Sequence, residues 1–131
     1  MNGRDVQAAM LAYLKSKPIV TSLLANNSQV KELQWQGDEF LYPAIRISVD
    51  FYPSLPPCNP EKAEVYIDVF SEQKSSNEAS LIAAALKDLL HEHPFTYNGV
   101  KFPVVVVEKV NRPERSIYAW QSTVKVITKV N

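Results

Sequence analysis

Two segments of the chain carry apolar residues at the three- and four-residue spacing of a helix with one buried side. In the first segment these residues are Val6, Ala9, Met10, Tyr13 and Leu14. In the second they are Ala79, Ile82, Ala83, Leu86, Leu89 and Leu90. Asp5 is placed to cap the first helix, and the run Ser75-Ser76-Asn77-Glu78 predicts a capping box at the start of the second. Pro18 and Pro94 end the two patterns, because a proline disfavours the helical conformation of the residue before it.

Further segments predict β-strands, because apolar and polar residues alternate along them or because turn residues bound an apolar run. They are residues 32–36, 45–51, 63–71, 104–110 and 116–129. In the fourth segment an unbroken run of valines predicts burial on both faces where the strand starts. In the last segment we expect one face to carry Tyr118, Trp120, Val124 and Val126.

The pair Asn98-Gly99 predicts a type I′ turn and a small hairpin over residues 95–102, because that turn needs two positive φ angles. Most other strands follow one another directly. We therefore expect a mainly antiparallel sheet of about four to five strands with both helices packed on one face. A parallel crossover is expected only where the chain passes through the second helix. The predicted class is α+β.

Composition limits the classes of function. The 131 residues are expected to form a single domain, 1–131, and a hydrophobic content of 46% excludes a disordered tail. Fourteen basic and 14 acidic residues give zero net charge, which removes the long-range attraction to DNA or to an anionic membrane. No apolar run approaches the roughly 18 residues of a membrane span, and the first residues lack the apolar core of a signal peptide. A single cysteine, Cys58, excludes an intramolecular disulfide framework.

A search for catalytic chemistry finds no convincing site. His91 and His93 are two residues apart, so they lie on different sides of a helix and do not match the spacing of a zinc protease. They are better explained as polar residues favoured at a helix C-terminus when protonated. Cys58 has no histidine near it in the sequence that would act as a base. The chain has three glycines and no glycine-rich phosphate loop, which excludes nucleotide binding through such a loop.

Asp50 and Asp68 point outward from two strands that are candidates to be neighbours, which raises the possibility of a pair of catalytic carboxylates. Arg46 is expected on the same face as Asp50. Ion pairs across a solvated sheet are common, and without a pocket signature they are the favoured interpretation. We predict no catalytic, cofactor-binding or metal-binding residue, and therefore no enzyme.

Two segments are candidate interaction surfaces. Residues 52–62 contain four prolines within eight residues, which forbid both a regular strand ladder and a helix. This segment is interpreted as either a projecting arm that contacts a partner or an irregular crossover. Basic residues also gather at the turn near residue 112, although Glu108 and Glu114 dilute their charge and favour a solvated turn. The candidate interface residues are Tyr52, Pro53, Leu55, Arg112 and Arg115.

The order of these elements resembles that of the small tail-terminator, or tail-completion, proteins of long-tailed bacteriophages. The first helix precedes a YPAIRISV strand at residues 42–49. A VYIDVFSE strand at 65–72 then leads into the helix SSNEASLIAAALKDLL, and a YAWQSTVKVIT strand at 118–128 closes the domain. The likeness covers nearly the whole chain. The proline-rich segment is a departure from the family pattern.

The resemblance implies a structural role without a cofactor. Subunits of this family form a homo-hexameric ring on the last ring of tail-tube protein, halt polymerisation of the tube and provide the surface onto which the head connector or neck docks. The resemblance also implies that DNA passes through the lumen without sequence-specific recognition, that no membrane is involved, and that the protein is made in the host cytoplasm and ends in the neck of the virion. Two alternatives stay open: another head–tail joining protein, such as a connector or stopper, or a small hydrolase or ligand-binding domain.

Overall fold

The computed structural model describes residues 2–33, 41–52 and 61–131. The helices are α1 (Gly3–Lys15), α2 (Pro18–Thr21) and α3 (Asn77–Leu90), with one 3-10 turn, η1 (Asn27–Gln29). The strands are β1 (Val30–Glu32), β2 (Ala44–Tyr52), β3 (Glu61–Ser71), β4 (Phe95–Tyr97), β5 (Val100–Phe102), β6 (Val104–Val110), β7 (Glu114–Arg115) and β8 (Trp120–Val130).

The main sheet has the strand order β1-β2-β3-β8-β6, with the short β7 also paired to β8. All of its pairs are antiparallel except β1–β2. The α+β class, the mainly antiparallel sheet and the separate β4–β5 hairpin are therefore confirmed. Within the described residues the sheet has six strands, because the two-residue β7 adds one. After α3 and the hairpin, the chain re-enters the main sheet as β6. This strand is antiparallel to β8 and therefore runs parallel to β3, to which it is not hydrogen-bonded. The hydrogen-bonded parallel pair is β1–β2, which the sequence does not predict.

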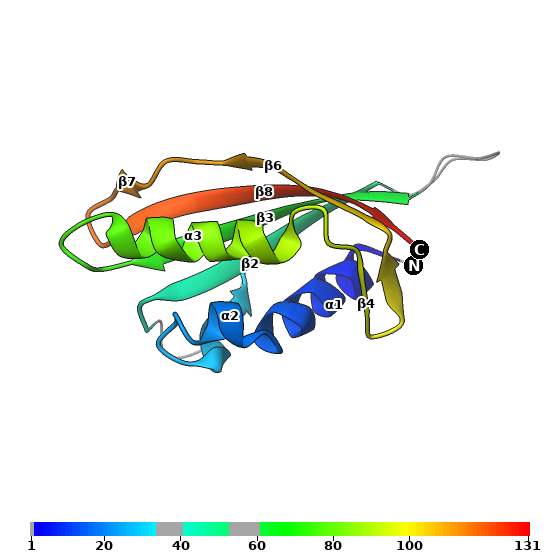
Figure 1. Cartoon of the computed structure of the whole chain (residues 1–131), viewed down its shortest axis with the longest axis horizontal. Helices are drawn as coiled ribbons and strands as arrows, with labels where there is room; N and C mark the ends of the chain where they lie inside the picture. Colours follow the sequence, from blue (N-terminus) through cyan, green and yellow to red (C-terminus); the bar gives the residue numbers. More distant parts are fainter. Residues whose placement is uncertain (1, 34–40, 53–60) are drawn as a thin grey trace.

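All three helices lie on the same side of the main sheet (Figure 1). α1 packs on β2, and α3 packs on β3, β8 and β6. The stripe predicted for α1 is buried as expected, and in α3 only Leu89 stays partly exposed. The helices cover the inner side of the sheet. The side chains of β3 on that side are fully buried: Ala63, Val65, Ile67 and Val69. Burial of apolar surface between these two layers is the main stabilising contribution to the fold.

The β4–β5 hairpin closes the core beside α1 with a row of aromatic rings. The rings of Tyr13 and Phe95 stack at 3.7 Å between centroids, and those of Phe95 and Phe102 at 4.4 Å. Burial raises the pKa of the Tyr13 hydroxyl. Asn98 and Gly99 have φ angles of 50° and 77°, so the predicted type I′ turn is confirmed.

Both predicted helix caps are wrong. α1 begins at Gly3, and its N-cap is Asn2, whose Oδ1 accepts a hydrogen bond from the Asp5 N–H at 3.0 Å. Asp5 instead completes a capping box by accepting from the Asn2 N–H at 3.4 Å.

The N-cap of α3 is Ser76, whose side chain makes no capping hydrogen bond, while the Ser75 hydroxyl accepts from the Asn77 N–H at 3.4 Å. The carboxylate of Glu78 does not reach back to Ser75 and instead accepts a hydrogen bond from the Ser71 hydroxyl of β3 at 2.7 Å. A tertiary contact has replaced the local one.

Three strand predictions also differ from the structure. Val104 and Val106 are exposed while Val105 and Val107 are buried, because β6 is an edge strand whose other face has no helix on it. The last strand begins at Trp120, which leaves Tyr118 outside it and 77% exposed. The first strand covers residues 30–32, and the rest of the predicted segment 32–36 lies almost entirely outside the described residues.

Candidate assembly surface

The side of the main sheet opposite the helices is covered by no described helix (Figure 1). We call it the open face. Its side chains alternate with the buried ones and mix aromatic, aliphatic and charged groups. It is formed by Glu64, Tyr66, Asp68, Phe70, Thr123, Lys125, Ile127, Val104 and Val106. Aromatic side chains are enriched in the buried core of protein–protein interfaces, whereas charged side chains such as Glu, Asp and Lys are found mainly at the polar rim.

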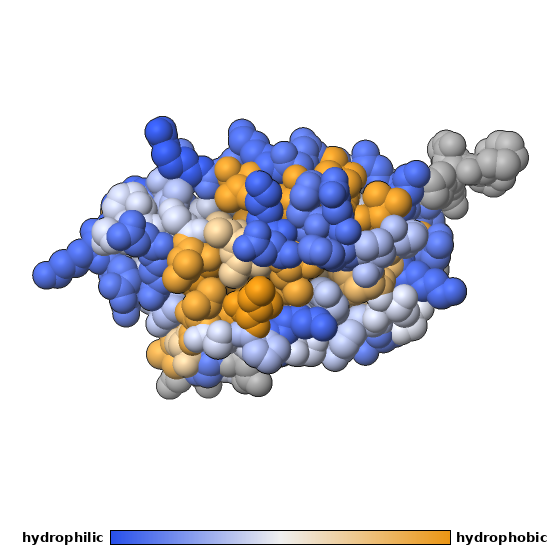
Figure 2. All heavy atoms as spheres, in the orientation of Figure 1, coloured by the Kyte–Doolittle hydropathy of each residue, from blue (hydrophilic) through white to orange (hydrophobic). Residues whose placement is uncertain are grey.

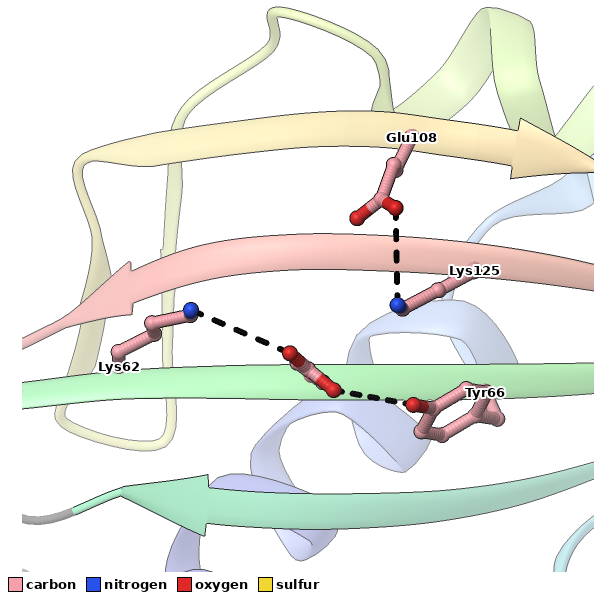
Figure 3. A network of polar contacts seen from close by, with 5 residues as sticks. Lys62, Tyr66, Glu108 and Lys125 are labelled. Carbon is pink, nitrogen blue, oxygen red and sulfur yellow. Dashed lines mark hydrogen bonds and ion pairs between the residues drawn. The ribbon is translucent and has the colours of Figure 1, made fainter.

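A network of polar contacts crosses the open face (Figure 3). The Glu64 carboxylate accepts a hydrogen bond from the Tyr66 hydroxyl at 2.9 Å and lies 3.9 Å from the ammonium group of Lys62. On the neighbouring strands, Lys125 forms an ion pair with Glu108 at 3.6 Å. The Lys125 ammonium also lies 5.8 Å from the centre of the Tyr66 ring, which joins the two pairs. The network therefore spans β3, β8 and β6.

The charges of this network shift two pKa values. The hydrogen bond to Glu64 raises the pKa of the Tyr66 hydroxyl, because it favours the protonated form. Burial alone would lower the pKa of Lys125, but the negative charges of Glu108 and Glu64 outweigh it and raise the pKa. Both groups therefore keep their protons to a higher pH than usual.

The register does not bring Asp50 and Asp68 together. Asp50 lies opposite Glu64, whereas Asp68 lies opposite Arg46. The Asp68 carboxylate accepts a hydrogen bond from the Thr123 hydroxyl at 2.6 Å. Within residues 2–33, 41–52 and 61–131, no three His, Cys, Asp or Glu side chains are grouped to hold a metal ion. A pair of catalytic carboxylates is thus not formed by the two aspartates that raised the possibility.

Arg46 is not the solvated charge that the alternation predicts. Its side chain is 3% exposed and donates hydrogen bonds to the carbonyl oxygens of Gln29 at 2.9 Å and Ile45 at 2.8 Å. Desolvation lowers the pKa of the guanidinium, and Tyr42 opposes this shift. Arg46 donates to backbone oxygens where η1 leads into β1, so its side chain stabilises the fold and is not a solvated surface charge.

His91 also has a role that the sequence does not predict. Its Nδ1 accepts a hydrogen bond from the backbone N–H of Val107 at 3.0 Å, which requires a lone pair on that nitrogen. The next residue, Glu92, donates its backbone N–H to the Val105 carbonyl at 2.8 Å. The segment after α3 therefore covers part of the free edge of β6, a common protection against edge-to-edge association. A protonated His91 at the helix terminus, as expected above, would lose this bond.

The candidate interface residues that the structure describes fall at two opposite ends of the sheet. Tyr52 is the last residue of β2, is 47% exposed, and pairs with Lys62 in the β2–β3 ladder. The ends of the predicted arm thus belong to strands. Pro53 and Leu55 lie outside the described residues. At the other end of β3, Ser71 pairs with Trp120, which pairs with Arg115.

Arg112 and Arg115 line a shallow depression of about 250 Å³ beside β7. The other lining residues are Asn111, Glu114, Ser116, Gln121 and Thr123. The guanidinium of Arg115 lies 5.9 Å from the centre of the Trp120 ring, while both arginine side chains stay exposed. Neither forms a salt bridge with another described residue. The depression offers positive charge and hydrogen-bond donors, which suit a carboxylate.

Comparison with known proteins gives matches in structure alone. No protein-family model matches the chain, and no curated protein matches it. A chain in the virion of a native gene transfer agent particle superposes with a TM-score of 0.77 at 15% identity, covering 95% of this chain and 93% of that one. A second solved chain superposes with a TM-score of 0.62, also at 15% identity, over 100% of this chain and 96% of its own. At this identity the likeness establishes the fold, and it does so end to end.

No helix among the described residues is long and apolar enough to cross a membrane.

Proposed function

We propose that this protein is a structural component of a tailed virion, and specifically a tail terminator. Copies of it form a hexameric ring at the head-proximal end of the tail tube. The ring stops polymerisation of the tube and presents the surface onto which the head docks. It works without catalysis or a cofactor, and DNA passes through its lumen without being read.

The observation that carries this proposal is the fold shared along the whole chain with a component of a gene transfer agent virion. The match includes 93% of that chain, so it is not a common substructure within a larger protein. It agrees with the order of helices and strands that resembles tail terminators.

The distribution of surfaces adds support. One side of the sheet is closed by helices, and the other is an open face with aromatic rings and a charged network. A ring subunit needs separate contacts for its ring neighbours and for the layers above and below it. The open face and the two ends of the sheet supply three distinct surfaces of this kind. Because fold alone does not define function, the proposal depends on a test in the particle.

The experiment is to delete the coding sequence in the strain that produces the particle and to image the products by electron microscopy. A tail terminator is expected to leave tubes of uncontrolled length and heads without tails. Tails of normal length that fail to join heads would instead identify a connector or stopper. Restoring the unaltered gene must restore normal particles. Normal numbers of complete particles in the deletion strain would overturn the proposal.

A further inference from the structure

The outward side of α3 is unusually apolar for a surface helix. Leu81 is 58% exposed, Ala84 is exposed and Ala85 is half-buried. These residues follow the spacing of one helical face, which ends at the exposed Asp88. Because the opposite side of α3 is the buried stripe, the helix carries apolar residues on two sides. Such a helix normally has a charged outer side unless something covers it.

The short helix α2 extends this apolar surface. Ile19, in α2, is 50% exposed, and α2 packs against α3. Figure 2 shows hydrophobic atoms gathered over the region where the two helices meet, at the lower left of the view. We call this surface the helix patch and define it as Ile19, Leu81, Ala84 and Ala85. Exposed apolar residues on neighbouring helices often mark a protein contact.

A second, convex apolar feature lies at the end of the sheet between β7 and β8. Ile117 and Tyr118 are 87% and 77% exposed, and we call this pair the knob. Hydrogen bonds close the turn that carries it. Ser116 donates to the Ala119 carbonyl from its N–H and from its hydroxyl, both at 2.9 Å, and its Oγ accepts from the Ala119 N–H at 3.2 Å. A knob held in this way loses little conformational entropy on binding.

The charges beside the two surfaces are complementary. Arg115 lies two residues before the knob, and Asp88 lies at the end of the helix patch. Neither forms a salt bridge with another described residue. Leu81 and Asp88 are about 10 Å apart along the helix axis, from the rise of 1.5 Å per residue. The Arg115 guanidinium lies 5.9 Å from the centre of the Trp120 ring, so the side chain turns away from that ring when it faces Asp88.

We propose that the knob of one copy packs on the helix patch of a second copy, with Arg115 facing Asp88. Rigid aromatic and aliphatic anchors beside a peripheral ion pair are the usual composition of an interface hot spot. The two surfaces differ, so the contact is heterologous, and repeating it gives a ring when the rotation closes. This inference rests on the proposed function only for the ring; the contact between two copies stands independently of it.

The first test is cross-linking of cysteine variants in a Cys58→Ser background with a short bismaleimide. The pair Glu114→Cys and Ala84→Cys is expected to give a ladder of covalent dimers, trimers and higher species on denaturing gels, because Glu114 is an exposed residue of β7 beside the knob and its replacement leaves Ile117 and Tyr118 in place. The ladder forms because each copy offers both reactive groups to different neighbours. A matched control combines Glu114→Cys with Val106→Cys, which lies on the open face. Single Glu114→Cys controls for a contact between two β7 turns.

The second test is charge reversal, measured as the association constant of the purified chain by analytical ultracentrifugation. Arg115→Asp and Asp88→Arg are each expected to weaken self-association by about fivefold, which corresponds to about 1 kcal/mol. The double variant is expected to restore it. Ile117→Ser with Tyr118→Ser is expected to weaken it by about tenfold or more.

The outcomes separate this inference from the proposed function. A cross-link yield no higher than the control pair, both in concentrated solution and in purified particles, overturns the inference even if the protein is found as a ring in the neck. Failure of the double charge variant to restore association also contradicts it. A clear ladder with rescue supports the contact even if deletion shows that the protein is not a tail terminator.

Discussion

The two sides of the main sheet have the same backbone but very different surroundings, and β3 shows this residue by residue. Val65, Ile67 and Val69 point toward the helices and are completely buried. Glu64 and Tyr66 alternate with them, point to the open face and stay partly exposed. The helix-covered side therefore carries most of the stability of the fold. The open face keeps its aromatic and charged groups accessible, which is what an assembly surface requires.

The largest expected difference between the two sides is in the response to the same truncation. Ile67→Ala, on the covered side, is expected to lower the free energy of unfolding by about 2–5 kcal/mol, because it leaves a cavity in the core. Ile127→Ala, on the open face, is expected to cost about 1 kcal/mol, since water fills the space. Chemical denaturation of both variants measures the difference. Equal losses of unfolding free energy in the two variants would show that Ile127 is packed as tightly as the core and that the open face is not accessible to water.

Arg46 is the exception that sharpens the comparison, because it lies on the open side and is nevertheless buried. Arg46→Met is expected to destabilise the fold by about 1–3 kcal/mol, since it removes the donors to two backbone carbonyl oxygens. Arg46→Lys retains a donor and is expected to cost less. If Arg46→Met unfolds at the same denaturant concentration as the wild type, the hydrogen bonds of Arg46 do not stabilise the fold.

A charge reversal on the open face is expected to separate assembly from folding. Lys125→Glu places a negative charge between Glu108 and Glu64, yet the site is accessible to water, so thermal unfolding should change little. In complementation of the deletion strain, the same variant is expected to reduce complete particles strongly. Lys74→Glu, an exposed charge in the turn before α3, is the matched control and should complement. Full activity of Lys125→Glu would remove the open face from the proposal.

The smallest expected effect is a dependence of stability on alkaline pH. Tyr66 and Lys125 have pKa values raised in the folded protein, so their contribution is complete below the pKa of the unfolded chain, near 10. It is lost as the pH rises through the higher folded values. Denaturation midpoints measured between pH 9 and about pH 11 should therefore fall, and fall less in Tyr66→Phe. An identical decline in both proteins would exclude Tyr66 as the cause.

The arrangement of layers could be predicted from the sequence because it depends on periodicity. The stripes of α1 and α3 and the alternation of β3 each reflect burial on one side, and the Asn98-Gly99 turn depends on two φ angles that few residues adopt. The helix caps could not be predicted in the same way. The Glu78 carboxylate can accept a hydrogen bond either from a backbone N–H near the helix start or from the Ser71 hydroxyl. The second bond forms because α3 packs on β3, and this packing is not visible in the local sequence.

The candidate surface was less predictable than the fold. Lys62 and Glu64 are two residues apart on one strand, which is a visible signal for an ion pair. The pairing of Glu108 with Lys125 depends on the β6–β8 register and on a bulge after Val107, neither of which the sequence encodes locally. The pattern of residues 116–129 predicts Tyr118 on a strand face, because the turn that contains it has no glycine to indicate a turn. The interface roles of Tyr52, Pro53, Leu55, Arg112 and Arg115 stay predictions.

The central claim is that this chain is a ring-forming component at the head-proximal end of a tail. The most direct measurement is a cryo-electron-microscopy reconstruction of the intact particle at a resolution sufficient to trace side chains. The account predicts six copies of this fold in one layer between the last ring of the tube and the head, with density for Ile117 and Tyr118 against α3 of the neighbouring copy. A particle neck built without this chain, or a copy of it elsewhere in the virion, would contradict the claim.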